Sequence, residues 1–200
     1  ASHALYAIAA DGSEATLLAD VPAYDPAWSP DGARIAYWAY TDPTPSGLWA
    51  ETELFLIDAD GAGLRRLTDN ARPDRSPAWS PDGSQLAFVR DHAVWILDVE
   101  RGRERRVTRD VESVAWSPDG RWLALTRGSD GAILLVRPDG TGRHRIARSN
   151  HYGDQWGYGE PVDWTPGGRI AYVTSNTKLA TMTRKGTGRR PLTDRGYTPA

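Results

Sequence analysis

The stretch Pro77-Ala78-Trp79-Ser80-Pro81-Asp82-Gly83 decides the fold, because the chain repeats it. Nearly the same residues stand at 26–32 and 114–120, and a degenerate copy stands at 162–168. In this motif Pro fixes its own φ and Gly supplies a positive φ, so each copy predicts a tight turn between two strands. A short apolar run follows every copy, at 34–37, 85–88, 122–125 and 169–172.

A second motif follows each of these runs. It consists of another apolar run, an acidic or glycine turn, and a basic stretch that ends in an aliphatic residue. Its copies span 54–68, 94–108, 133–147 and 179–193, and a fifth copy at 5–18 has no Trp motif before it. Each full unit therefore predicts four short strands, which we letter a to d, at a repeat length near that of a propeller blade.

The sequence thus predicts an all-β fold, a β-propeller of four-stranded antiparallel blades. We expect one domain over residues 1–200, with a half blade at 1–20, full blades at 21–68, 69–108, 109–147 and 148–193, and the start of another at 194–200. This count is compatible with a near-closed five-bladed ring or with part of a larger propeller. An open set of blades would expose strand edges and would be expected to aggregate or dimerise.

The repeat resembles a known family. Its Ala-Trp-Ser-Pro-Asp-Gly turn, Ile-Ala-Tyr or Leu-Ala-Phe strand and Asp-Gly…Arg-Arg-Leu-Thr ending are similar to the TolB-type (WD-like) β-propeller repeat, over nearly the whole chain. The resemblance implies a bacterial periplasmic or secreted setting. It leaves the function open, because this repeat serves scaffolds, lectin-like modules and gating domains of peptidases.

Composition excludes several classes of protein and site. The 200 residues are 40% hydrophobic and 25% charged with a net charge of −2, which is typical of a globular protein and gives no argument for nucleic acid. Cysteine is absent, which excludes disulfides and thiolate metal sites. No apolar run is long enough for membrane insertion. We expect no cofactor and no metal.

Two long insertions carry the first group of candidate binding residues. They lie at 40–51 and 149–160, and the blade order places both on the face that holds the b–c and d–a connections. Aromatic rings among amides and charges suit a carbohydrate or a peptide, although the rings could instead tuck down as plugs over the blades. The candidates are Tyr40, Trp49, His151, Tyr152, Trp156 and Tyr158.

A second group of candidates lies near the mouth of the central channel. Four residues before each repeated Trp stand Tyr24, Arg75, Glu112 and Glu160, and the b–c loops add Arg90, His92 and Arg127. These residues could line a polar pocket of mixed charge, or they could be solvated or paired with each other. The repeated Trp28, Trp79, Trp116 and Trp164 are expected to be core residues.

No catalytic constellation is visible in the sequence. The sequence therefore favours a non-catalytic binding or scaffolding propeller that recognises a protein, peptide or glycan on the face with the long loops. One alternative is the gating propeller of a larger prolyl-oligopeptidase-like hydrolase. Another is a sugar-active enzyme, for which Glu112 and Glu160 are the carboxylate pair to test.

Overall fold

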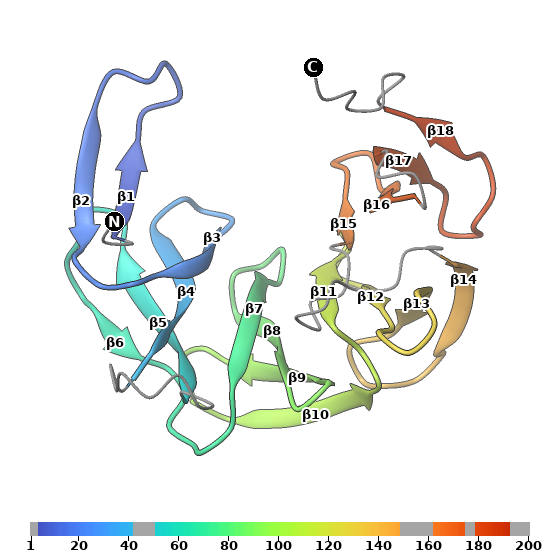
Figure 1. The fold of residues 1–200 in the computed structure, drawn as a ribbon, viewed down its shortest axis with the longest axis horizontal. Coiled ribbons are helices and arrows are strands. Elements are labelled where there is room, and N and C mark those ends of the chain that lie inside the picture. Colours follow the sequence, from blue (N-terminus) through green and yellow to red (C-terminus); the bar gives the residue numbers. More distant parts are fainter. Residues whose placement is uncertain (1–3, 42–50, 149–161, 175–178, 193–200) are drawn as a thin grey trace, which may run out of the picture.

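The computed structural model describes residues 4–41, 51–148, 162–174 and 179–192. In these residues the chain forms five antiparallel sheets arranged as an open ring (Figure 1). The first sheet is a half blade of β1 (Leu5–Ile8) and β2 (Ala15–Ala19). The fold predicted from the sequence, a propeller with a half blade followed by four-stranded blades, is confirmed.

Four full blades follow the half blade, each with its strands in chain order across the sheet. Blade 1 holds β3 (Tyr24–Trp28), β4 (Arg34–Tyr40), β5 (Thr52–Asp58) and β6 (Arg65–Arg66). Blade 2 holds β7 (Asp74–Trp79), β8 (Gln85–Arg90), β9 (Ala93–Asp98) and β10 (Glu104–Arg109). Blade 3 holds β11 (Ser113–Trp116), β12 (Leu123–Thr126), β13 (Ala132–Val136) and β14 (His144–Arg148). Blade 4 holds β15 (Val162–Trp164), β16 (Ile170–Val173), β17 (Leu179–Met182) and β18 (Arg190–Pro191).

The repeated motif makes the turn between strands a and b, and its side chains hold that turn closed. In blade 2 the Ser80 hydroxyl donates to Asp82 at 2.6 Å and accepts from the Gln85 amide at 2.9 Å. Gly83 has a φ of 71°, a conformation that costs glycine little. Each Ser-Pro-Asp-Gly segment is therefore a self-contained turn, and its serine is occupied by local hydrogen bonds.

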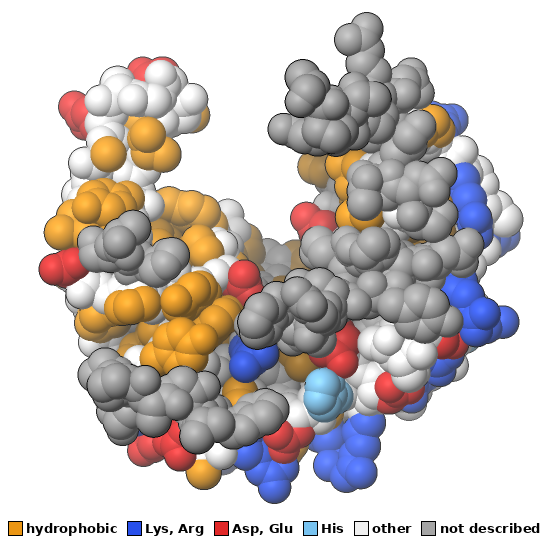
Figure 2. All heavy atoms as spheres, viewed as in Figure 1, with side chains coloured by type: hydrophobic (Ala, Val, Ile, Leu, Met, Phe, Trp, Pro, Cys, Tyr) orange, Lys and Arg blue, Asp and Glu red, His pale blue; other side chains and the backbone are white. Residues whose placement is uncertain are grey.

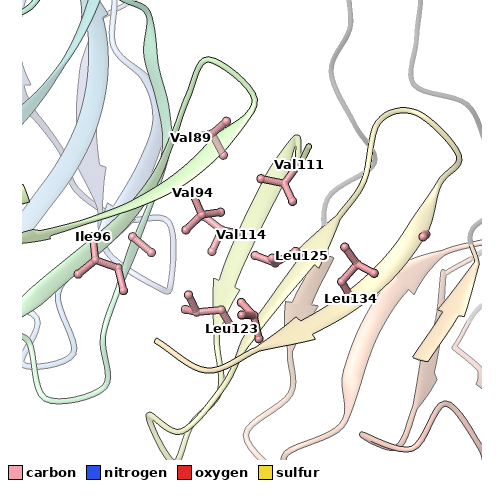
Figure 3. Close-up of a cluster of buried hydrophobic side chains, with 11 residues drawn as sticks. Val89, Val94, Ile96, Val111, Val114, Leu123, Leu125 and Leu134 are labelled. Atoms are coloured by element: carbon pink, nitrogen blue, oxygen red, sulfur yellow. The ribbon is translucent and has the colours of Figure 1, made fainter. Parts of the chain in front are cut away.

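The core consists of separate apolar layers between neighbouring blades. The layer between blades 2 and 3 brings Val94 and Ile96 of β9 against Leu123 and Leu125 of β12 and Leu134 of β13 (Figure 3). Similar layers join blades 1 and 2 and blades 3 and 4. Each blade thus depends on its neighbour for burial, as in other repeat architectures.

The repeated Trp residues differ in burial, which corrects the expectation that all of them are core. Trp79 is 8% exposed and its Nε1 donates to the Ala27 carbonyl of blade 1 at 3.0 Å. Trp164 is equally buried and donates to the Ala115 carbonyl of blade 3 at 3.3 Å. Trp79 and Trp164 therefore dock on the innermost strand of the preceding blade, whereas Trp116 is partly buried and its Nε1 has no acceptor in the described structure. Trp28 is 51% exposed because the described half blade before it has only strands c and d and offers no such strand.

Candidate functional site

The candidate residues fall into two sets according to what the structure describes. Tyr24, Tyr40, Arg75, Arg90, His92, Glu112 and Arg127 are described. Trp49, His151, Tyr152, Trp156, Tyr158 and Glu160 lie outside the described residues, so their role stays a prediction. The described set forms an aromatic cluster, a buried ion-pair clamp and two surface pairs, rather than one pocket.

The aromatic cluster consists of Tyr24, Trp38 and Tyr40. Tyr24 and Trp38 are paired across β3 and β4 and their rings stack with centroids 4.3 Å apart. Tyr40 meets both rings edge-on, each at 5.7 Å. Trp38 is buried, whereas Tyr40 is 42% exposed at the base of the first long loop. Hydrophobic side chains gather over β3, β4 and β5 on the face that Figure 2 shows.

Charged and polar groups border this cluster on the innermost strands. The guanidinium of Arg75 lies 5.8 Å from the centre of the Trp38 ring. The Trp38 Nε1 donates to the exposed carboxylate of Asp25 at 2.8 Å, and the Ser76 hydroxyl approaches the same oxygen at 3.4 Å. The cluster therefore presents an apolar ring, a carboxylate and a guanidinium close together.

The backbone that carries Asp25 and Ser76 is irregular. Both residues have positive φ, 46° and 53°, at equivalent positions in β3 and β7. Each sits where the pairing register shifts, between Tyr24 and Ala27 in blade 1 and between Arg75 and Ala78 in blade 2. Bulges of this kind redirect side chains and recur beside functional sites.

Arg90 lies in a buried clamp and is not presented to solvent. Its Nε donates to Asp74 Oδ1 at 2.6 Å and its Nη2 to Asp74 Oδ2 at 2.7 Å, and its Nη1 donates to Glu104 at 2.5 Å. The rings of Phe88 and Trp95 cover it, with centres 5.0 and 5.1 Å away. Burial raises the pKa of Asp74 against the opposing hydrogen bonds from Arg90. Arg90 therefore acts as a structural residue that joins the edges of blade 2.

Glu53 extends this clamp to the connection between blades 1 and 2. It is fully buried, and it accepts from Arg66 Nη2 at 3.0 Å, from the Asn70 amide at 2.6 Å and from the Thr68 hydroxyl. Asn70 Nδ2 also donates to Asp74 at 3.1 Å. The first long loop begins and ends beside this fixed platform, where the Thr41 amide donates to the Glu51 carbonyl at 3.1 Å.

The remaining candidates form two surface pairs. His92 Nδ1 lies 2.6 Å from Glu112 Oε1, and His92 is exposed. Arg127 donates to Asp130 through Nε at 2.7 Å and Nη2 at 2.5 Å. The hydrogen bond from Arg127 holds the pKa of Asp130 well below its usual range. These residues are mutually paired, which was the alternative interpretation of their charges.

Sequence reasoning missed Trp38 and Asp25, which the structure places at the centre of the aromatic cluster. Trp38 lies in a run that is typical of an ordinary strand b, and Asp25 directly precedes the Trp motif at 26–32. The signal for Trp38 was available in the sequence, since Trp38 and Tyr40 alternate and so point to the same side of strand b. The bulge at Asp25 had no such signal.

The described part of the chain has no helix of the length and hydrophobicity that crossing a bilayer needs. Nowhere in that part of the chain do three or more His, Cys, Asp or Glu side chains come close enough together to hold a metal ion.

Comparisons with known proteins agree with this geometry. The solved structure of a putative TolB from Agrobacterium tumefaciens superposes with a TM-score of 0.75 at 24% identity, over 96% of this chain and 74% of that one. The Tol-Pal system protein TolB of Hahella chejuensis is 38% identical over 74 residues. By sequence and by fold the chain is similar to TolB-type β-propeller repeat proteins. Residues 50–114 also match the family model of the dipeptidyl peptidase IV N-terminal region.

The matches cover small shares of the curated relatives. The Dipeptidyl-peptidase 5 of Porphyromonas endodontalis is 36% identical over 61 residues, which are 30% of this chain and 9% of that protein. The match to Hahella TolB covers 35% of this chain and 17% of that protein. The comparisons therefore establish the repeat and its fold. They do not assign the activities of the full-length relatives to this chain.

Proposed function

We propose that this propeller is a non-catalytic module whose long-loop face binds a peptide segment of a protein partner. The observation that carries the proposal is the aromatic cluster of Tyr24, Trp38 and Tyr40 with Asp25 and Arg75 at its border. The exposed Tyr40 ring offers apolar contact. The carboxylate and the guanidinium beside it can orient a polar backbone or a charged side chain.

The same geometry favours a peptide over a glycan. Sugar rings bind best on a flat, open aromatic face. Here Trp38 is buried, and its ring is stacked on Tyr24 at 4.3 Å with Arg75 lying 5.8 Å from its centre. Tyr40 is only partly exposed and meets both rings edge-on, which suits the irregular surface of a peptide better than the flat face of a sugar.

The pairing of ionisable groups supports a non-catalytic role. Arg90 and Glu53 are held by several partners each, and Arg127 is held by Asp130. A general acid or base needs access to substrate, and in the described residues of this face the exposed His92–Glu112 pair is the best candidate for one. Its proposed second carboxylate, Glu160, lies outside the described residues.

The similarity to TolB proteins supports a protein partner and a periplasmic setting. Several relatives carry the name Tol-Pal system protein TolB. We propose by analogy that this propeller works in the bacterial periplasm. Cell fractionation of a tagged chromosomal copy tests the setting.

A combined peptide and glycan array tests the ligand class. We expect peptide ligands for the wild type, and loss of signal for Tyr40→Ala and for the double variant Trp49→Ala, Trp156→Ala. The matched control is Tyr6→Ala, another exposed tyrosine (57%) that lies on the half blade. If the wild type instead binds glycans, and the same variants lose that binding, the ligand class is a glycan and not a peptide. Ligands that persist in every variant would overturn the assignment to this face.

A second function has its own observation in favour. The match to the dipeptidyl peptidase IV N-terminal region and the identity to Dipeptidyl-peptidase 5 support a propeller that belongs to a larger peptidase. Assay of the full-length gene product with chromogenic dipeptide substrates tests it. Release of the chromophore, lost on serine-directed inhibition, would favour this alternative.

A further inference from the structure

Charge is distributed very unevenly along the chain, although its net value is only −2. Residues 1–100 contain six basic residues (Lys and Arg) and 16 acidic residues (Asp and Glu). Residues 101–200 contain 18 basic residues and ten acidic residues. The ring therefore has an acidic half and a basic half. Lys and Arg side chains follow its outer rim over β10, β14 and β18 (Figure 2).

Many arginines of blades 2 and 3 lack a counter-ion within the described residues. Arg90, Arg101, Arg127 and Arg148 form ion pairs with carboxylates. Eight more have no carboxylate oxygen within 4.0 Å in the described structure: Arg103, Arg105, Arg106, Arg109, Arg121, Arg137, Arg143 and Arg145. Asp139 interacts at longer range with Arg105 and Arg137, and Asp119 with Arg121. The like charge of the other five destabilises the isolated fold and is relieved when an anion binds.

Three of these arginines line a groove between blades 2 and 3, on the face of the tight turns. The groove has a volume of about 740 Å³ and is lined by Arg105, Arg121 and Arg137, together with Trp116 and the turns at 80–82 and 118–120. We call it the basic groove. It lies on the face opposite the long loops, so it is separate from the aromatic cluster.

Two of the guanidinium groups are held in place. Arg105 Nη1 donates to the Pro138 carbonyl at 2.6 Å, which leaves its other donors available. The guanidinium of Arg137 lies 5.0 Å from the centre of the Trp122 ring. Guanidinium groups that are already ordered lose less entropy when they bind a carboxylate through two parallel hydrogen bonds.

The acidic residues in the groove wall are already used by the turns. Asp82, Asp119 and Asp139 accept from the side chains of Ser80, Ser117 and Thr141 at 2.6, 2.6 and 2.7 Å. These hydrogen bonds lower the pKa of each carboxyl. Their charges balance the three lining arginines, so the excess positive charge comes from the five arginines on and beside β10 and β14.

Trp116 lines the groove as its aromatic residue. Its Nε1 is buried and has no acceptor in the described structure, whereas the equivalent atoms of Trp79 and Trp164 donate to backbone carbonyls. A buried N–H without an acceptor is costly. Because this atom has no accessible surface, Trp116 offers a groove ligand its ring and not its N–H.

We propose that the basic groove binds an acidic peptide segment of a partner protein. An anionic polysaccharide fits less well, because the aromatic side chain of the described lining, Trp116, is partly buried. Beside the groove, Arg137 covers the Trp122 ring on one side, and the His144 ring meets it edge-on at 5.5 Å. A chain of carboxylates can instead engage Arg105, Arg121 and Arg137 in turn.

Fluorescence anisotropy with a labelled octaglutamate peptide tests the proposal, with octaglutamine as the neutral control. We expect octaglutamate to bind at low salt and to weaken as salt rises. The variant Arg105→Gln, Arg121→Gln, Arg137→Gln should bind about tenfold or more weakly, which corresponds to ~1.4 kcal/mol. The control, Arg189→Gln, Arg190→Gln, removes two charges of the same kind from the edge of blade 4, against three in the groove variant, and should bind like the wild type.

Several results would overturn the proposal. Equal weakening in both variants would mean that octaglutamate binding depends on the overall positive charge of the protein and not on the groove. Binding of polygalacturonate without binding of octaglutamate would reassign the groove to an anionic sugar. A salt-sensitive dimer that is lost in the groove variant would make a second copy the occupant. Arg121→Glu serves as a single variant in case the triple variant fails to fold, because its side chain makes no described hydrogen bond or ion pair.

Discussion

Replacing the repeated tryptophans one at a time measures how much the contact between neighbouring blades contributes to the free energy of unfolding. Trp79 and Trp28 occupy the same place in the same motif, but Trp79 is 8% exposed and Trp28 is 51% exposed. A Trp side chain buries up to about 250 Å², so the difference of 43% corresponds to about 110 Å², or ~2.7 kcal/mol at about 25 cal/mol per Å². Loss of the hydrogen bond from Trp79 to the Ala27 carbonyl adds about 1 kcal/mol.

We therefore expect Trp79→Ala to lower the free energy of unfolding by about 3 to 4 kcal/mol more than Trp28→Ala does. Urea denaturation of both variants, followed by far-ultraviolet circular dichroism, gives the comparison. Because both changes are made in one motif, the effect of the turn itself cancels. A difference below about 1 kcal/mol would refute the assignment of Trp79 as the residue that docks blade 2 on blade 1.

The other stability predictions concern the clamp and the turns. Arg90→Leu should cost about 3–5 kcal/mol, because it leaves the buried Asp74 carboxylate without its main partner, and adding Asp74→Leu should recover part of that loss in a double-mutant cycle. Gly186→Ala should destabilise far more than Gly168→Ala on urea denaturation. Both glycines have positive φ, but a Cβ at Gly186 would lie 2.0 Å from the Ile146 carbonyl oxygen and one at Gly168 would meet nothing within 4 Å. Similar losses in the two variants would contradict the close contact between blades 3 and 4.

The repeat itself carried most of the information about the fold. Four copies of one turn motif, each followed by two apolar runs, are enough to predict both the strands and their order in a blade. The burial of each Trp was not predictable from the motif alone, because it depends on whether a complete blade precedes it. Trp28 shows this directly, since its sequence context matches that of Trp79 and its exposure does not.

The candidate site was less predictable than the fold. The residue types near the channel mouth were identified, but Arg90 proved to be a buried structural residue and Arg127 a surface partner of Asp130. Ion pairing across strands depends on side-chain reach and register, which a single sequence does not fix. The aromatic cluster needed the structure for the same reason, because Tyr24 meets Trp38 only through the pairing of β3 with β4.

The dissociation constant of an array-selected peptide tests the central claim, which is recognition on the long-loop face, most directly. We expect Tyr40→Ala to weaken binding by about tenfold or more, as for a central aromatic contact, and Tyr6→Ala to leave it unchanged. Unchanged affinity in Tyr40→Ala, with the variant folded as judged by circular dichroism, would contradict the account and would move the binding site away from the aromatic cluster.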